Sequence, residues 1–348
     1  MREYHYQYAG CADRDYPTET HFGLFTLSDN TMVDIPQQYP FAGEWGYSTI
    51  ESANIREEMP MPSCLDLVYL SIVEEKFYEL SMPINDAEME QFFRRIQESC
   101  EDEADAKIIV GMSPYGGVAL WLGNRKKQLL LGWTKLPETE VSMSDFLPTQ
   151  PSLSLHDYCL SYGLELVAPS PTNLFDKRMQ QFCYRYLVLF ENWDEEQELW
   201  QKPEKEEGGG EKSANQPELD FVDEALYDGT YDKLRDGGLL RHHNAGKPKK
   251  LVVKWHLKKS DYTAYFWFDE QDITTAFDRF YGVHRDTRTD FIIHIDPKKK
   301  KYELALYRYG LQKPVVINES AYQLIIFKSK FEYFRSENYN QPHGAWVW

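Results

Sequence analysis

Apolar residues alternate with polar ones in short runs along much of the chain, a pattern that predicts β-strands joined by tight turns. The runs "LVYLSI" and "FYELSM" flank "VEEK", and "KIIVGM" and "VALWLG" flank "SPYGG". An earlier run, "THFGLFTLSDNTMVDIP", has the same form with "SDN" as its turn. Each pair of runs indicates an antiparallel hairpin.

Two helices are predicted after hairpins of this kind. Asn85 is a candidate N-cap with Glu88 three residues later, and Asp269 is another with Asp272 three residues later. Apolar side chains then follow at helical spacing, namely Met89, Phe92, Phe93 and Ile96 in the first helix and Ile273, Ala276, Phe277 and Phe280 in the second. Two later runs, "FDKRMQQFCYRYLVLF" and "SAYQLIIFKSKFEYF", could each form a closing helix, although their aromatic content leaves strands open.

The chain also resembles itself. A shift of 184 positions aligns Leu65–Leu131 with Lys249–Val315 without a gap, and it matches strand with strand and helix with helix. We therefore predict an α+β fold of two tandem pseudo-repeats. Each would be a mainly antiparallel sheet, ordered ββαβββ with an optional closing helix, and one helix would pack on one face.

Domain boundaries follow from a polar segment in the middle of the chain. Residues 194–220 are rich in Glu and Gly and carry no apolar period, which is typical of a linker. The predicted domains are a first copy over 1–193, with an N-terminal hairpin and an insert at 137–173, an acidic linker over 194–223 and a second copy over 224–348.

Charge narrows the range of partners. The formal net charge of −18 argues against nucleic acid or an anionic membrane surface and suits a basic partner, with solubility as the simpler explanation. The first copy has 29 acidic and 14 basic side chains, whereas residues 247–348 have 12 and 18. The two copies have therefore diverged in charge.

Five widely spaced cysteines predict neither a zinc site nor a disulfide framework. No apolar run reaches the roughly 18 residues that a membrane-spanning helix needs. The letters "YAGC" at Tyr8–Cys11 look like the end of a lipoprotein signal, but "REYHYQ" before them is polar. We expect a cytoplasmic protein, or an envelope lipoprotein if the N-terminus has been trimmed.

Catalytic signatures are scarce, since the sequence lacks GxxxxGK[ST], GxSxG and HExxH. The histidines of the second half, among them the adjacent pair His242 and His243, do not favour a metal site, because neighbours in a strand point to opposite faces. The acidic pair Glu74 and Glu75 lies at a predicted turn, where charges are normally solvated. We expect no enzymatic activity, cofactor or metal.

Four blocks resemble an uncharacterised bacterial domain family across about Tyr16–Trp193. They are "YPTETHFG", "GEWGYS", "MPSCLDLVYLSIVEEKFYELSMPI" and "IIVGMSPYGGVALWLG". Members of that family are commonly small lipoproteins or soluble proteins encoded beside toxic effectors of the type VI secretion system. The resemblance implies an immunity protein, which binds and blocks a toxin. No catalytic residue is carried over, and the second copy and the missing lipoprotein signal depart from the family pattern.

The predicted partner is a cognate effector protein, with a basic surface if charge contributes to binding. The acidic run and three aromatic or turn residues are the expected contacts: Glu98, Glu101, Asp102, Glu103, Asp105, Tyr115, Trp121 and Trp133. Core packing is the competing explanation for each aromatic residue. Two other functions stay open, namely a non-enzymatic binding or regulatory module without a toxin partner, and an unrecognised hydrolase.

Overall fold

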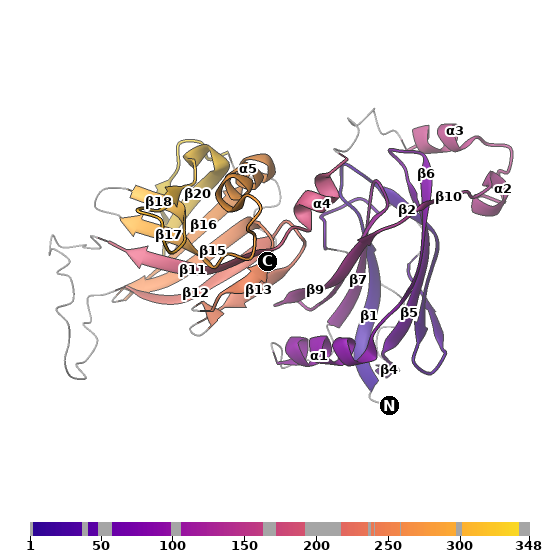
Figure 1. The fold of residues 1–348 in the computed structure, drawn as a ribbon, viewed down its shortest axis with the longest axis horizontal. Coiled ribbons are helices and arrows are strands. Elements are labelled where there is room, and N and C mark those ends of the chain that lie inside the picture. The colour runs from indigo at the N-terminus through magenta and orange to yellow at the C-terminus, as the bar shows by residue number, and fades with distance from the viewer. Residues whose placement is uncertain are drawn as a thin grey trace. The chain divides into compact units, whose positions relative to one another are not determined.

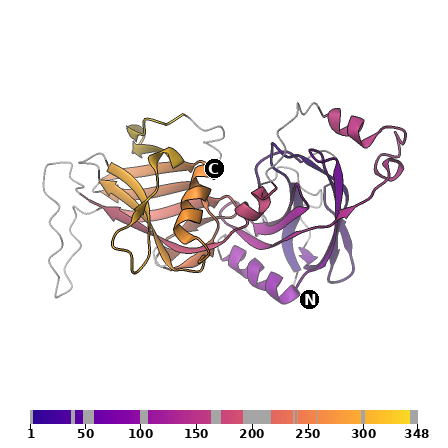
Figure 2. The ribbon, with the colours of Figure 1, turned by 45° about the horizontal axis from the view of Figure 1, so that its top comes forward.

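A computed structural model describes residues 3–36, 41–47, 58–98, 106–162, 172–191, 217–235, 238–239, 241–257, 259–296 and 301–340. The chain forms two compact units (Figures 1 and 2), the first made of Met1–Met179 with Asp228–Tyr231 and the second of the remaining residues. The fold is mainly β with a few short helices, and the described strands form three sheets, one of them of 11 strands in mixed directions.

The first unit contains ten strands and four helices in the described residues. The strands are β1 (Glu3–Cys11), β2 (Thr18–Leu27), β3 (Met32–Asp34), β4 (Glu58–Pro60), β5 (Pro62–Ser71), β6 (Lys76–Pro83), β7 (Ala106–Ser113), β8 (Gly117–Gly123), β9 (Gln128–Lys135) and β10 (Glu138–Thr139). The helices are α1 (Asp86–Gln97), α2 (Met143–Phe146), α3 (Leu155–Leu160) and α4 (Leu174–Arg178).

Strand pairing in the first unit builds two layers. One has the order β4-β1-β7-β8-β9 and belongs to the 11-stranded sheet, and the other is a five-stranded sheet with the order β10-β6-β5-β2-β3. The predicted hairpins β2–β3, β5–β6 and β7–β8 are confirmed. The β7–β8 turn needs left-handed backbone at Tyr115 (φ 58°) and Gly116 (φ 73°), which suits its "YGG" sequence.

Helix α1 begins where the sequence predicts. The side chain of Asn85 accepts hydrogen bonds from the backbone N–H groups of Ala87 and Glu88, which satisfies donors that the helix leaves open. Its apolar stripe packs against the interior, where Phe93 stacks on Tyr4 with ring centroids 4.4 Å apart. The main core of the first unit therefore lies between its two sheets and this helix, and two smaller clusters lie around Trp121 and around Leu70.

The second unit contains the remaining strands and helices. They are β11 (Phe182–Phe190), β12 (Glu218–Leu226), β13 (Tyr231–Leu234), β14 (His243–Ala245), β15 (Pro248–Leu257), β16 (Ser260–Phe268), α5 (Glu270–Tyr281), β17 (Thr289–Asp296), β18 (Lys301–Tyr307), β19 (Val315–Val316), the short 3-10 helix η3 (Glu319–Ala321), β20 (Tyr322–Lys328) and β21 (Phe331–Arg335). Asp269 caps α5 as predicted, by accepting from the N–H of Asp272.

Two layers again enclose the core of the second unit. The order β21-β20-β16-β15-β12-β13 belongs to the 11-stranded sheet, and β14-β11-β17-β18-β19 forms the third sheet. Strand β11 runs parallel to β17, and the other pairings that involve these strands are antiparallel. Buried aromatic residues from both layers, including Trp255, Phe277 and Phe291, fill the interior.

One expectation needs correction. The class is mainly β and not α+β, because the described helices are few and most are short. The two later runs, for which helix and strand were both left open, form mostly strands: β11 follows the short α4 in the first run, and β20 and β21 make up most of the second. Strand β1 was not predicted, and its parallel pairing with β7 adds a parallel pair to sheets that were expected to be mainly antiparallel.

The division between the units falls at Met179 and Gln180, so β11 lies in the second unit and not in the predicted first copy. Most of the predicted linker is outside the described residues, but its last positions are already part of β12. Among the described helices, none combines the length and apolar character that crossing a membrane demands. Within the same residues, Cys11, Cys64, Cys159 and Cys183 are free thiols.

Candidate functional site

An apolar groove opens on the first unit between α1, the end of β6 and β9. Its volume is about 240 Å³. The side chains that line it are predominantly apolar, among them Leu65, Leu80, Met82, Met89, Phe92, Val118, Leu120 and Leu131, while Asn85, Glu88 and Thr134 supply its polar part. Concave apolar surfaces with few polar groups are typical binding sites.

One wall of the groove is the end of β6. Strand β6 pairs with β5 along its length, whereas β10 pairs with it only at Phe77 and Tyr78. Further along, Leu80 and Met82 are half-buried although they point toward the interior. The groove therefore lies at a part of the sheet edge that no described strand covers.

The other walls come from α1 and β9. Met89, Phe93 and Ile96 of α1 are buried, and Phe92 faces the groove half-exposed, with the guanidinium of Arg95 5.7 Å from the centre of its ring. On β9, residues 131–134 line the opposite side. Trp133 is 47% exposed, but it pairs with Ala119 and its ring contacts Phe175 at 5.9 Å, so its side chain lies on the face of the sheet opposite to the groove.

The predicted contact residues have different positions. Trp133 lies on β9, with its side chain on the face opposite to the groove. Trp121 is fully buried, and its indole N–H donates to the carbonyl oxygen of Asp228 at 3.0 Å, so this residue belongs to the interior and offers no surface to a partner. Tyr115 lies in the β7–β8 turn, where its N–H donates to Oε2 of Glu74 at 2.7 Å.

The acidic run is described only at its start. Glu98 is the exposed C-cap of α1. The remaining predicted contacts lie outside the described residues, namely Glu101, Asp102, Glu103 and Asp105. Sequence reasoning therefore named none of the side chains that face the groove as a contact residue. Their signal was present in the alternation of Leu80 and Met82, but that alternation is equally typical of a closed core.

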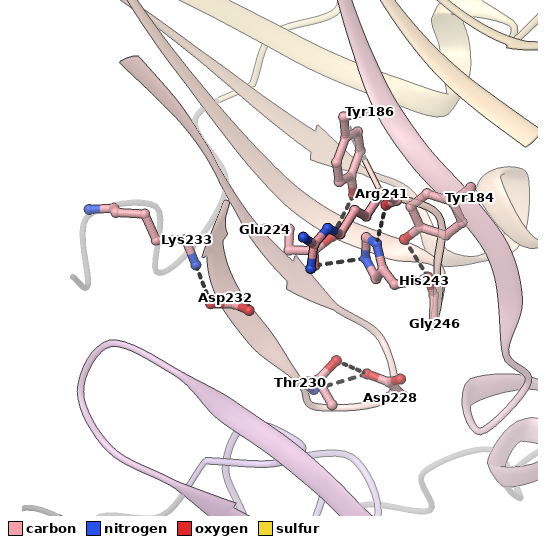
Figure 3. Close-up of polar contacts among 10 residues, drawn as sticks. All are labelled: Tyr184, Tyr186, Glu224, Asp228, Thr230, Asp232, Lys233, Arg241, His243 and Gly246. Atoms are coloured by element: carbon pink, nitrogen blue, oxygen red, sulfur yellow. Dashed lines mark hydrogen bonds and ion pairs between the residues drawn. The ribbon is translucent and has the colours of Figure 1, made fainter. Parts of the chain in front are cut away.

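A second notable cluster lies inside the second unit, where Glu224 of β12 is only 4% exposed (Figure 3). The hydroxyl of Tyr186 donates to its Oε2 at 2.8 Å, and Nε2 of His243 lies 3.5 Å from its Oε1. Tyr184, next to this pair, donates to the carbonyl oxygen of Gly246 at 2.7 Å. A buried carboxylate is thus held by a neutral donor and an imidazole.

The pKa of His243 depends on its interaction with Glu224. Burial by itself would lower the pKa of His243, but the hydrogen bond and charge of Glu224 outweigh it and raise that pKa above its ordinary value. Burial raises the pKa of the Tyr186 hydroxyl well above its usual range, so it stays a donor. The position of Glu224 therefore favours the protonated form of His243.

The other histidine of the predicted pair lies apart from this cluster. Nε2 of His242 is 3.6 Å from Oδ1 of Asp290, which also accepts from Nε of Arg185 at 2.7 Å. Burial lowers the pKa of His242. Over the described part of the chain, no three His, Cys, Asp or Glu side chains are grouped so that they could hold a metal ion.

Comparisons with known proteins place the first unit in a family. No curated protein and no solved structure matched the chain. A family model did match, over residues 2–181, which is half of the chain and nearly the whole of the first unit. On this match, the chain belongs to the DUF2931 family of proteins of unknown function.

Proposed function

We propose that this protein is an immunity protein, which binds a toxic effector of a type VI secretion system and neutralises it by occlusion. The observation that carries the proposal is the apolar groove on the family domain, with half-exposed Phe92 on its α1 wall. Affinity between proteins is concentrated in a few aromatic and apolar contacts seated in such hollows. An inhibitor of this kind needs a surface and no catalytic residue.

Charge supports a basic partner. Residues 1–193 carry 29 acidic and 14 basic side chains, and exposed Glu88 lies at the groove itself. An acidic surface speeds encounter with a basic protein and disfavours acidic competitors. We place the protein in the cytoplasm, together with its target.

We also propose that the second unit is a second copy of the family domain. Strand β1 pairs in parallel with β7 and antiparallel with β4, and β11 pairs in parallel with β17 and antiparallel with β14. The antiparallel series β2–β5–β6 has its counterpart in β12–β15–β16. A 12-residue helix with a side-chain cap follows β6 and β16 alike.

Two strand irregularities and one side-chain contact recur in both units and support the duplication. The β2–β5 pairing is irregular after Thr20 and after Thr26, and the β12–β15 pairing is irregular at the same spacing, after Leu219 and after Ala225. Such bulges are specific local features of a fold. A side-chain contact recurs as well. The hydroxyl of Tyr6 donates to the carbonyl oxygen of Pro60 at 2.5 Å, and Tyr184 donates to that of Gly246 at 2.7 Å.

Co-expression tests the immunity function. The genes next to this one are first searched for an effector-like reading frame. Its product is then expressed in cells with and without this protein, and we expect those cells to grow only when this protein is present. Phe92→Ala should weaken binding by about 30-fold, as expected for a contact worth about 2 kcal/mol. The matched control is Tyr309→Ala, since Tyr309 is fully exposed on the second unit.

Two results would count against the proposal. If cells die equally with and without the protein, it is not the immunity factor for that effector. If growth is rescued but both variants bind alike, the groove is not the contact surface. A binding or regulatory module without a toxin partner would give the first result and still bind some other protein through Phe92.

A further inference from the structure

The two units differ in how much of one strand edge is paired, namely the edge of the strand that precedes the capped helix, β6 in the first unit and β16 in the second. In the second unit, β20 pairs with β16 at seven consecutive positions, from Tyr262 to Phe268. In the first unit, β10 pairs with β6 at only two, Phe77 and Tyr78. The rest of β6, up to Pro83, has no partner strand on this side among the described residues.

The uncovered positions are the ones that line the groove. We aligned β6 with β16 through the N-caps of the helices that follow them, Asn85 and Asp269. In this alignment Leu80 corresponds to Ala264, and Met82 corresponds to Phe266. Ala264 and Phe266 are 0% and 1% exposed, whereas Leu80 and Met82 are only half-buried. The difference is one of coverage, because both pairs point toward a core.

The side chains of β20 supply that coverage in the second unit. Tyr322, Leu324 and Ile326 stand opposite Phe268, Phe266 and Ala264, and all three are buried in the core. They alternate along the strand, so every second residue enters the interior. The groove of the first unit occupies the corresponding space.

Chain connectivity explains why β10 covers so little of the β6 edge. Strand β9 ends at Lys135 and β10 begins at Glu138, so only Leu136 and Pro137 connect them. Leu136 still donates to the carbonyl oxygen of Gly116, beside the β9 layer. The chain thus reaches the β6 edge at Glu79, whose N–H donates to Pro137, and it cannot extend over the following residues.

We propose that the β6 edge of the first unit receives an extended strand from the partner protein, in the place that β20 takes in the second unit. This inference rests on the proposed binding function and names its mode, addition of a strand to a sheet edge. The incoming strand would run antiparallel to β6. Three alternating apolar side chains would lie opposite Leu80, Met82 and Ile84 and fill the groove.

Backbone groups for this pairing are already aimed outward. Because the N–H of Glu79 points toward β10, the period of two directs the N–H and C=O of Ser81 to the same side. Pro83 has no N–H, which is tolerated at a sheet edge. Exposed Glu79 and Glu88 flank the position, so Lys or Arg between the apolar residues of the strand would add favourable charge.

A peptide of this chain serves as the probe, without any toxin. It contains residues 320–329, "SAYQLIIFKS", with added terminal lysines for solubility and a fluorescent label. We expect the full-length protein to bind it in anisotropy titrations. A control peptide with Leu324 and Ile326 replaced by Ser should bind at least tenfold more weakly, because it cannot fill the groove.

A matched pair of variants tests the backbone contact. Ser81→Pro removes the outward N–H and should weaken peptide binding at least tenfold, whereas Ser81→Ala keeps that N–H and should bind like the wild type. Circular dichroism checks that both are folded. Equal affinity of the Pro and Ala variants, or equal binding of both peptides, would overturn the inference.

Disulfide trapping gives a second measurement that does not depend on the proline variant. Met82→Cys should form a disulfide with a peptide carrying Cys in place of Leu324, because these positions would face each other at a distance that a disulfide spans. Met32→Cys, 67% exposed on β3, is the control and should not react selectively. Equal trapping at both positions would contradict the register.

The same variants distinguish a foreign partner from a second copy of this chain at the β6 edge, and they test strand binding separately from the immunity function. If the wild type is a dimer in sedimentation experiments and Ser81→Pro makes it a monomer, the edge binds a second copy of this chain, and the assignment to a foreign partner is wrong. Failure of toxin rescue with intact peptide binding would instead reject immunity and leave the strand-binding edge standing.

Discussion

Glu224 is an ionisable residue in an aromatic interior. Under the proposed duplication it takes the position of Phe25, since both lie just before the second irregularity of their strand. In the first unit Phe25 stacks on Tyr8 at 4.3 Å, and in the second Tyr186 donates to Glu224. A stacked aromatic pair has thus been exchanged for a hydrogen bond to a buried carboxylate, whose loss would leave a donor unsatisfied.

The histidine beside it should make stability depend on pH. The pKa of folded His243 is raised above about 6.5, so its pairing with Glu224 stabilises the fold fully below that pH and less as pH rises through the folded value. We expect His243→Gln to lower the free energy of unfolding more at about pH 6 than at about pH 8.5. Urea unfolding at the two pH values measures this difference.

A second variant isolates the cause. With Glu224→Gln already in place, the larger effect of His243→Gln at about pH 6 should disappear or reverse, because the interaction that raises the pKa has been removed and burial, which lowers it, remains. A larger effect at about pH 6 that persists in this background would assign it to other neighbours of the imidazole, such as Asp232.

Individual contact residues could be predicted from the sequence only where the exposure of their side chains could be inferred. Trp133 was expected at a contact surface and is 47% exposed, whereas Trp121 was expected there too and is buried. Both lie in apolar runs of strand residues. The difference arises because Trp121 points toward Trp45 and Asp228, which are distant in sequence, and a local pattern carries no information on such neighbours.

Helix starts and hairpin turns are the elements that sequence predicts best, because their signals are local. Asn85, Asp269 and the "SPYGG" turn all act as expected. Strands β1 and β20 were missed or left as possible helices. Their neighbours β7 and β16 lie far away along the chain, and dense aromatic residues suit either a buried strand or a helix face.

The cap of α1 provides a test at this scale, and it borders the groove. Asn85→Ala removes the acceptor for two N–H groups and should lower the free energy of unfolding by about 1 kcal/mol. Asn85→Asp retains an acceptor and should be close to the wild type. Urea titrations followed by circular dichroism compare them. Equal stability of the Ala and Asp variants would mean that tertiary packing alone holds this end of the helix.

At the scale of the molecule, the internal resemblance was visible in sequence but the division of the chain was not. The predicted boundary followed composition and placed the first copy at 1–193, whereas the first unit ends at Met179 and also takes in Asp228–Tyr231. A unit assembled from separate stretches leaves no compositional mark. The uncovered part of the β6 edge is equally invisible, since it depends on which of the described strands pair across long distances in the sequence.

The discontinuous first unit leads to a prediction about fragments. The indole N–H of Trp121 donates to Asp228, and the side-chain amide of Gln128 donates to the carbonyl oxygen of Gly229 at 2.7 Å. A fragment of residues 1–181 matches the family region but lacks both acceptors. In this fragment, the indole N–H of Trp121 and the side-chain amide of Gln128, both buried in the full chain, lose these partners. Each such loss costs about 1–3 kcal/mol.

The fragment should therefore unfold at lower urea concentration than the same unit in the full-length protein, as followed by tryptophan fluorescence. Gly229→Ala tests the same turn within the full chain. Its φ of +88° is unfavourable for alanine, and an added Cβ would lie 2.9 Å from the Trp121 ring. Gly238→Ala is the control, because its nearest contact would be an ordinary 3.8 Å. If the fragment and Gly229→Ala are both as stable as the full-length wild type, residues 228–231 are dispensable, and the family domain folds from one continuous stretch.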